Sequence, residues 1–128
     1  MTIPTPTNAD AVAVVHSFNE AINDRDLAGL ARLMTTSHRF IDSEGTAVHG
    51  RDASIDAWRG FFETFPDYRN VFEDVSDVGD GVVVVHGRSE CSFAPLDGHA
   101  DWRVVVLDGL VDVWQVSDPG VTPPRGQA

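Results

Sequence analysis

The apolar residues of this chain change their spacing once, near Val71. Before this point they recur every three or four residues, which is the spacing of one face of a helix. After it, apolar and polar residues alternate, as in strands with one buried face. A chain with helices first and strands second is expected to gather its helices on one face of an antiparallel sheet. The pattern therefore predicts an α+β fold.

The first part of the chain predicts three helices. A helix over residues 9–24 has one apolar face, formed by Ala11, Val14, Val15, Phe18, Ala21 and Ile22. Asp26 is expected to cap a second, shorter helix whose inward residues are Leu27, Leu30, Ala31 and Met34. A short strand from His38 then leads to Asp42 and a turn. The third helix begins near Gly50–Asp52 and ends before Pro66, with a stripe of Ile55, Trp58, Phe62 and Phe65.

The second part predicts four strands, over residues 71–78, 82–93, 99–107 and 110–117. Gly79–Gly81 and Asp108–Gly109 are typical of tight hairpin turns. The four valines 82–85 indicate a strand covered on both faces. A strongly curved sheet around a long helix makes a cone with an apolar pocket. We expect residues 1–8 to be a flexible lead-in, 9–118 to form one domain, and 119–128 to be a Pro-rich extended tail.

The charge and the cysteine content narrow the classes of partner. The chain has 20 acidic residues against 9 Lys and Arg, a net charge of −11. This charge repels phosphate backbones and anionic lipids, so no nucleic-acid or membrane partner is expected.

The single Cys91 excludes an intrachain disulfide, and the start MTIPTPTNAD lacks the features of a signal peptide, which predicts a cytoplasmic protein. The five histidines lack metal-ligand spacing, and no phosphate-binding motif occurs, so neither a metal nor a cofactor is expected.

Bulky residues lie on both faces of the strand over residues 99–107. Trp102, Val104 and Val106 alternate with Asp101, Arg103 and Val105. A partly apolar outer face on a curved sheet would normally be covered by a second copy of the chain. We therefore expect a homodimer formed through the outer face of the sheet.

Four motifs carry a resemblance to a known family. FIDSEG, HGRDA, FFETFPDYRN and DGLVDVWQVSD, taken in this order, resemble the SnoaL-like and ketosteroid-isomerase-like members of the NTF2-like superfamily. The resemblance spans roughly residues 9–118 and implies a cone-shaped fold. It leaves the activity open, because the superfamily includes isomerases, dehydratases, epoxide hydrolases, polyketide cyclases and proteins that catalyse nothing.

The resemblance also implies three catalytic carboxyl groups. Asp42 falls at the position of the general base, and Asp101 at that of an acid held neutral as a hydrogen-bond donor. Asp118 falls at the acid/base of the cyclases. The phenol that the isomerases place on the first helix is replaced by Phe18. From the residues alone, Asp42 could instead form a turn, Asp101 could pair with an arginine, and Asp118 could simply end a strand.

The pocket wall is expected to be largely aromatic. Its predicted substrate-binding residues are Phe18, Phe40, Trp58, Phe62, Tyr68, Trp114 and His99. Together with the three carboxyl groups, the resemblance implies proton transfer on a small hydrophobic carbonyl or polyketide-like substrate: isomerisation, dehydration or cyclisation. The alternative is a small-molecule-binding or interaction module without catalysis. A third hypothesis is water activation on an epoxide, with Arg88 or Arg103 bridging Asp101 and Asp118.

Overall fold

The computed structural model describes residues 8–117, which form three α-helices and six strands. The N-terminal part holds α1 (Asn8–Asn23), α2 (Leu27–Arg32), β1 (Met34–Ile41), β2 (Ala47–His49) and α3 (Arg51–Thr64). The C-terminal part holds β3 (Arg69–Gly79), β4 (Val82–Glu90), a 3-10 turn η1 (Ala94–Leu96), β5 (Gly98–Leu107) and β6 (Leu110–Ser117). The predicted tail beyond residue 118 lies outside the described residues.

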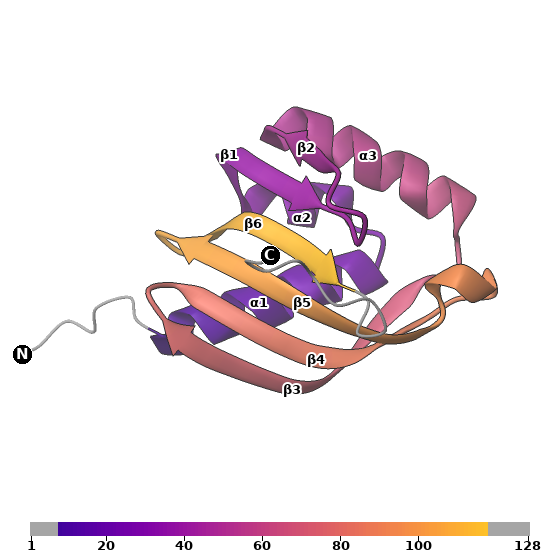
Figure 1. The fold of residues 1–128 in the computed structure, drawn as a ribbon. Helices are drawn as coiled ribbons and strands as arrows, with labels where there is room; N and C mark the ends of the chain where they lie inside the picture. The colour runs from indigo at the N-terminus through magenta and orange to yellow at the C-terminus, as the bar shows by residue number, and fades with distance from the viewer. Residues whose placement is uncertain (1–7, 118–128) are drawn as a thin grey trace, which may run out of the picture.

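All six strands form one sheet in the order β2-β1-β6-β5-β4-β3. β1 pairs with β6 in parallel, and the other described pairs are antiparallel. Figure 1 shows the sheet curving around α1, with α3 beside β1 and β2. The helices therefore lie on the concave side of the sheet, which confirms the predicted α+β cone.

The core lies between α1 and the concave face of the sheet. Val15, Phe18 and Ile22 follow one another at helical spacing along α1 and are fully buried. They pack in one cluster with the concave-face residues of the sheet, which are Val83, Val85, Trp102, Val104 and Trp114. Each such side chain contributes roughly 1.5–3 kcal/mol through its burial. Because these residues face α1, the packing determines which residues of each strand point inward.

The second helix is shorter than its apolar pattern predicted. The Asp26 carboxylate accepts the Gly29 N–H at 2.9 Å and begins the helix, as expected from the sequence. Met34, predicted as an inward helical residue, is instead the first residue of β1. The reason is pairing with the last strand: the Leu33 carbonyl accepts the Val111 N–H at 2.6 Å. The β-branched Thr35 and Thr36 then favour an extended chain.

β4 ends at Glu90 and not at Phe93 as the alternation predicted. The next two N–H groups are taken by carboxylates instead of by a neighbouring strand. Cys91 N–H donates to Asp97 at 3.0 Å, and Ser92 N–H donates to Asp67 at 3.1 Å. These bonds turn the chain away from the sheet and begin the loop that contains η1.

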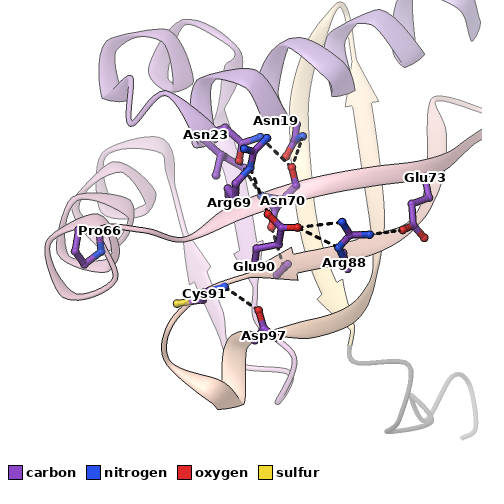
Figure 2. A network of polar contacts seen from close by, with 12 residues as sticks. Asn19, Asn23, Pro66, Arg69, Asn70, Glu73, Arg88, Glu90, Cys91 and Asp97 are labelled. Atoms are coloured by element: carbon purple, nitrogen blue, oxygen red, sulfur yellow. Dashed lines mark hydrogen bonds and ion pairs between the residues drawn. The ribbon is translucent and has the colours of Figure 1, made fainter.

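The convex face of the sheet carries both apolar and charged residues. Val82, Val84 and Val105 are half-buried there, so the four-valine segment is not covered on both faces within one chain. Arg88 lies on the same face between Glu73 and Glu90, with N–O distances of 2.9 and 3.0 Å (Figure 2). The homodimer expected through this face stays a prediction.

Residues 8–117 contain neither a membrane-spanning helix nor a cluster of metal-binding side chains. None of the helices there has the length and apolar character needed to cross a bilayer. The same residues hold no cluster of three or more His, Cys, Asp or Glu groups placed to bind a metal ion.

Candidate functional site

A cavity of about 450 Å³ lies at the end of the sheet where β4 and β6 finish and β5 begins. Its volume is in the range of pockets that hold small organic molecules. We call it the mouth cavity. It is lined by Ser43, Tyr68, Ser89, Pro95, Leu96, Asp97, His99, Ala100, Val116 and Ser117. Apolar groups alternate in this wall with hydroxyl and ionisable groups, which suits a ligand with an apolar skeleton and a few polar atoms.

The strand register brings the concave-face part of this wall together. Gly87 pairs with Ala100, and Trp102 pairs with Val116, so Ala100 and Val116 share the concave face with the core. Ser89 lies two residues beyond Gly87 on the same face of β4, and it is buried. These three side chains come from three neighbouring strands, so the wall depends on the sheet and not on one flexible loop.

The loop between β4 and β5 supplies the other side of the mouth cavity. It presents Pro95 and Leu96, and the hydrogen bond from Cys91 N–H to Asp97 fixes its base (Figure 2). The Cys91 sulfur lies 3.5 Å from an Asp67 oxygen, and burial followed by the nearby acidic groups raises the pKa of this thiol. The raised pKa favours the protonated thiol, which is the less nucleophilic form.

A buried polar chain reaches the mouth cavity from the helical layer. The Tyr68 hydroxyl lies 3.1 Å from Ser89 Oγ, which lies 2.9 Å from Asn70 Oδ1. Asn70 is held in turn by Asn23, which accepts its backbone N–H at 2.8 Å and donates to its carbonyl at 2.9 Å (Figure 2). Burial raises the pKa of Tyr68, so its phenol stays protonated. The chain places a fixed hydroxyl pair at the cavity wall.

Asp42 follows β1 and directly precedes Ser43, which lines the mouth cavity, whereas Asp42 itself is not one of the lining residues. Its Oδ1 accepts the N–H groups of Glu44 and Thr46, each at 2.9 Å, which makes it the turn-forming residue that the sequence left open. The parallel pairing of β1 with β6 ends at Ile41 and Gln115, the residues that precede Asp42 and the wall residue Val116 in the chain. Asp42 is half-buried, and the bonds to the turn use Oδ1, whereas Oδ2 is not part of them. The turn therefore orients the carboxylate without using both of its oxygens.

Asp101 lies on the convex face, opposite the mouth cavity. It pairs in register with His86, and its carboxylate lies 2.7 Å from His86 Nδ1. The hydrogen bond to Asp101 raises the pKa of His86. The predicted position of Asp101 inside the cone is therefore corrected, because the neighbouring Trp102 occupies the concave face. Asp118 lies outside the described residues.

The arginines needed for water activation on an epoxide also lie on the convex face. Arg88 bonds Glu73 and Glu90, and Arg103 pairs in register with Val84 on that face. Neither is among the residues that line the mouth cavity, so neither is placed to activate water there.

Most of the aromatic residues predicted for the pocket wall pack against one another. Phe18 packs against Trp114 in a tilted arrangement at 4.6 Å between ring centroids, and Trp58 lies 5.2 Å from Phe40 and 5.4 Å from Phe62. Phe18, Trp58, Phe62 and Trp114 are buried. They fill the deep part of the cone, so the space left for a ligand is at its mouth, where Tyr68 and His99 belong to the wall.

His38 lies at the bottom of this aromatic cluster. It is fully buried, stacks on Phe18, and its Nδ1 lies 2.8 Å from the Val111 carbonyl. Because a carbonyl only accepts, Nδ1 carries the proton and Nε2 bears a lone pair, for which no partner is described. Burial lowers the pKa of His38 from 6.5, against smaller opposing effects of the Val111 bond and Asp112.

Acidification is expected to destabilise the protein through His38. The folded state holds the ring neutral, whereas the unfolded chain binds a proton near the ordinary pKa of 6.5. The contribution of His38 to the free energy of unfolding is therefore complete above pH 6.5 and is lost as the pH falls below it. Denaturant midpoints measured between about pH 7.5 and about pH 5 should fall less in His38→Gln than in the wild type. His99→Gln is the control, because it removes an exposed histidine. An equal fall of the denaturant midpoint in His38→Gln and in the wild type would contradict this role of His38.

The family follows from comparison with known proteins. The model of the SnoaL-like domain matches residues 15–122. The chain belongs to the SnoaL-like family. No curated protein matches the chain significantly.

Solved structures show the same fold at low identity. A candidate polyketide cyclase from Sinorhizobium meliloti has a TM-score of 0.75 and 15% identity, covering 86% of this chain and 98% of its own. A candidate ketosteroid isomerase from Kribbella flavida has a TM-score of 0.73 and 18% identity, covering 94% and 84%. An LEH-like epoxide hydrolase from M. tuberculosis has a TM-score of 0.76 and 13% identity, covering 90% and 81%. At these identities the likeness shows the fold alone.

Several residues of this SnoaL-like site were missed from the sequence. The mouth cavity includes Ser43, Ser89, Asp97 and an apolar group formed by Pro95, Leu96, Ala100 and Val116. Ser89 carried a usable signal, since it continues the alternation of the buried Val83 and Val85. A second hollow of about 310 Å³ between α1 and α2 has acidic walls, including Glu20, Asp24 and Asp26. It lacks the apolar strand wall of the mouth cavity.

Proposed function

We propose that this SnoaL-like protein binds a small, largely apolar carbonyl compound in the mouth cavity and transfers a proton on it, with Asp42 as the base. The observation that carries the proposal is the wall itself. It combines the apolar Leu96, Ala100 and Val116 with hydroxyl groups, one of which belongs to Ser43, the residue after Asp42. Isomerisation, dehydration and cyclisation of such substrates all begin when a proton next to the carbonyl is removed.

The turn around Asp42 supports the role of a base. Two backbone N–H groups fix Oδ1, so Oδ2 has a defined direction without any movement of the chain. A positioned carboxylate in hydrogen-bonding reach of a substrate contributes roughly 10²–10⁴-fold to the rate as a general base. Removal of the proton leaves an enolate beside the apolar groups of the wall. Asp42 then returns the proton at another carbon or to a leaving oxygen.

Asp42→Asn is expected to lower turnover by roughly 10²–10⁴-fold, because an amide does not accept the proton. The measurement is an ultraviolet assay of conjugated enone formation from a β,γ-unsaturated ketone. The asparagine Oδ1 still accepts both N–H groups of the turn, so the fold is kept. The matched control is Glu44→Gln, which removes an exposed carboxylate of the same turn and should leave turnover unchanged. An Asp42→Asn variant as active as the wild type would contradict the assignment.

The second candidate function is binding without catalysis in the same cavity. It is favoured by Phe18, which does not donate a hydrogen bond, and by the position of Asp101 on the convex face. Under this function the protein would bind the ketone without converting it, and affinity would be nearly constant from mildly acidic to neutral pH. Catalysis by a carboxylate would instead give a rate that falls when the carboxylate is protonated.

A further inference from the structure

Tyr68 is the only tyrosine in the chain and lies between the end of α3 and the start of β3. Its ring packs edge-on against Phe61 at 4.7 Å between centroids, and only 6% of the residue is exposed. It nevertheless lines the mouth cavity, and its hydroxyl reaches Ser89, which lines the cavity too. The packing of the ring therefore holds the hydroxyl in one place at the cavity wall.

The chain formed by Tyr68, Ser89 and Asn70 has two possible directions of donation. Each hydroxyl group has one proton to donate. If Ser89 donates to Asn70 Oδ1, it accepts the phenol proton, and Asn70 Nδ2 is left buried with no described partner. If the amide is turned over, Nδ2 donates to Ser89, Ser89 donates to Tyr68, and the phenol proton is free to point elsewhere. The two amide orientations have the same shape.

The second direction pairs the buried Nδ2 of Asn70 and removes the bond to its Oδ1. Buried N–H donors without a partner are rarer in proteins than under-satisfied carbonyl oxygens, which favours this direction. An unpaired buried donor loses the hydrogen bond that water gave it in the unfolded chain, at a cost of about 1–3 kcal/mol. Asn19 and Asn23 donate to the backbone carbonyl of Asn70 at 3.4 and 2.9 Å, so the residue itself is held in place. The side-chain amide of Asn70 is then free to donate a hydrogen bond to Ser89.

We propose that Asn70 and Ser89 orient the Tyr68 hydroxyl as a hydrogen-bond donor to a carbonyl oxygen of a neutral, largely apolar ligand in the mouth cavity. Tyr68 contacts the ligand, and Ser89 and Asn70 are positioning residues. The apolar groups of Leu96, Ala100 and Val116 take the carbon skeleton. The ligand is neutral because the net charge of −11 and the nearby Asp97 repel an anion. This inference rests on the proposed function, since both place the ligand in this cavity.

The test measures the affinities of a ketone, 1-tetralone, and of its hydrocarbon analogue, tetralin. Both are measured for the wild type, Tyr68→Phe and Ser89→Ala. In Tyr68→Phe the preference for the ketone should fall by about 3- to 10-fold, the effect of one hydrogen bond, while tetralin affinity stays the same. The carbonyl stretching band of bound 1-tetralone should lie at lower frequency in the wild type than in Tyr68→Phe. Tetralin binding shows in each variant that the cavity is intact.

Ser89→Ala separates the two directions of the chain. If Ser89 donates to Tyr68, removal of the Ser89 hydroxyl makes the phenol a weaker hydrogen-bond donor and lowers the affinity for the ketone. If Tyr68 donates to Ser89, the same change frees the phenol and raises ketone affinity, which would overturn the proposal. An unchanged ketone preference and carbonyl band in Tyr68→Phe would also overturn it, with the proposed function intact. Failure of both compounds to bind the wild type would overturn the proposed function as well.

Discussion

Trp114→Ala is expected to lower the free energy of unfolding by about 3–5 kcal/mol, the usual cost of removing a large aromatic side chain from a core. Trp114 is fully buried, packs against Phe18, and lies beside Phe40 in the parallel register. Its loss opens a cavity between α1, β1 and β6 that rigid strands cannot close. A domain of ordinary stability keeps only about 5–15 kcal/mol in total, so much of the stability would be lost.

Urea denaturation measures this change directly. The control is Leu107→Ala, since Leu107 is 51% exposed and should change stability by less than about 1 kcal/mol. Equal midpoints for Trp114→Ala and the wild type would show that the aromatic cluster does not hold the cone together.

Gly87→Ala is expected to destabilise the protein by about 1–3 kcal/mol or more, because the added methyl group overpacks a rigid site. A Cβ atom at Gly87 would lie 2.1 Å from the Val71 carbonyl oxygen and 3.1 Å from Phe72 Cα. Both are backbone atoms of β3, next to the register shift between Phe72 and Asp74. β3 must therefore move away from β4 to admit the methyl group.

A matched glycine in a helix should behave in the opposite way. Gly60 lies in α3, where an added Cβ meets no atom within 4 Å. Gly60→Ala should raise stability by up to about 1 kcal/mol through helix propensity. Denaturation of both variants tests the pair, and a Gly87→Ala protein as stable as the wild type would contradict the close approach of the two strands.

The sequence predicted the helices and the hairpin turns because their signals are local. The spacing of Val15, Phe18 and Ile22 defines one helical face, and the cap at Asp26 needs only residues near it. Asp80 and Asp108 both adopt positive φ, near 58° and 54°, in the Asp-Gly turns expected from the sequence. β2 was missed because three residues over Ala47–His49 carry too little alternation to be recognised.

The orientation of Asp101 was not decided by local signals. Alternation along β5 says that Asp101 and Trp102 face opposite ways, but not which of them faces the helices. The packing of Trp102 against Phe72 at 5.0 Å decides it. A carboxylate at Asp101 stays near water on the convex face with His86, whereas on the concave face it would lose its hydration among buried aromatic residues.

The mouth cavity was the least predictable feature because its wall comes from separate segments. Strand register brings Ser89, Ala100 and Val116 together, and the segments after β1 and after α3 add Ser43 and Tyr68. The deep aromatic residues predicted for the wall satisfy the same sequence pattern as a core, and packing assigns them to the core. The sequence thus indicated a cone and its lining in general terms, while three-dimensional contacts selected the site.

The most direct test of the central claim is an NMR titration of the protein with 1-tetralone, followed through its amide and methyl signals. A ligand in the mouth cavity should shift the signals of Ser43, Ser89, Ala100 and Val116 most strongly and saturably. The claim that the ligand binds in the mouth cavity would be contradicted if the largest shifts lay around His86 and Arg103 on the convex face. It would also be contradicted if no signal shifted saturably.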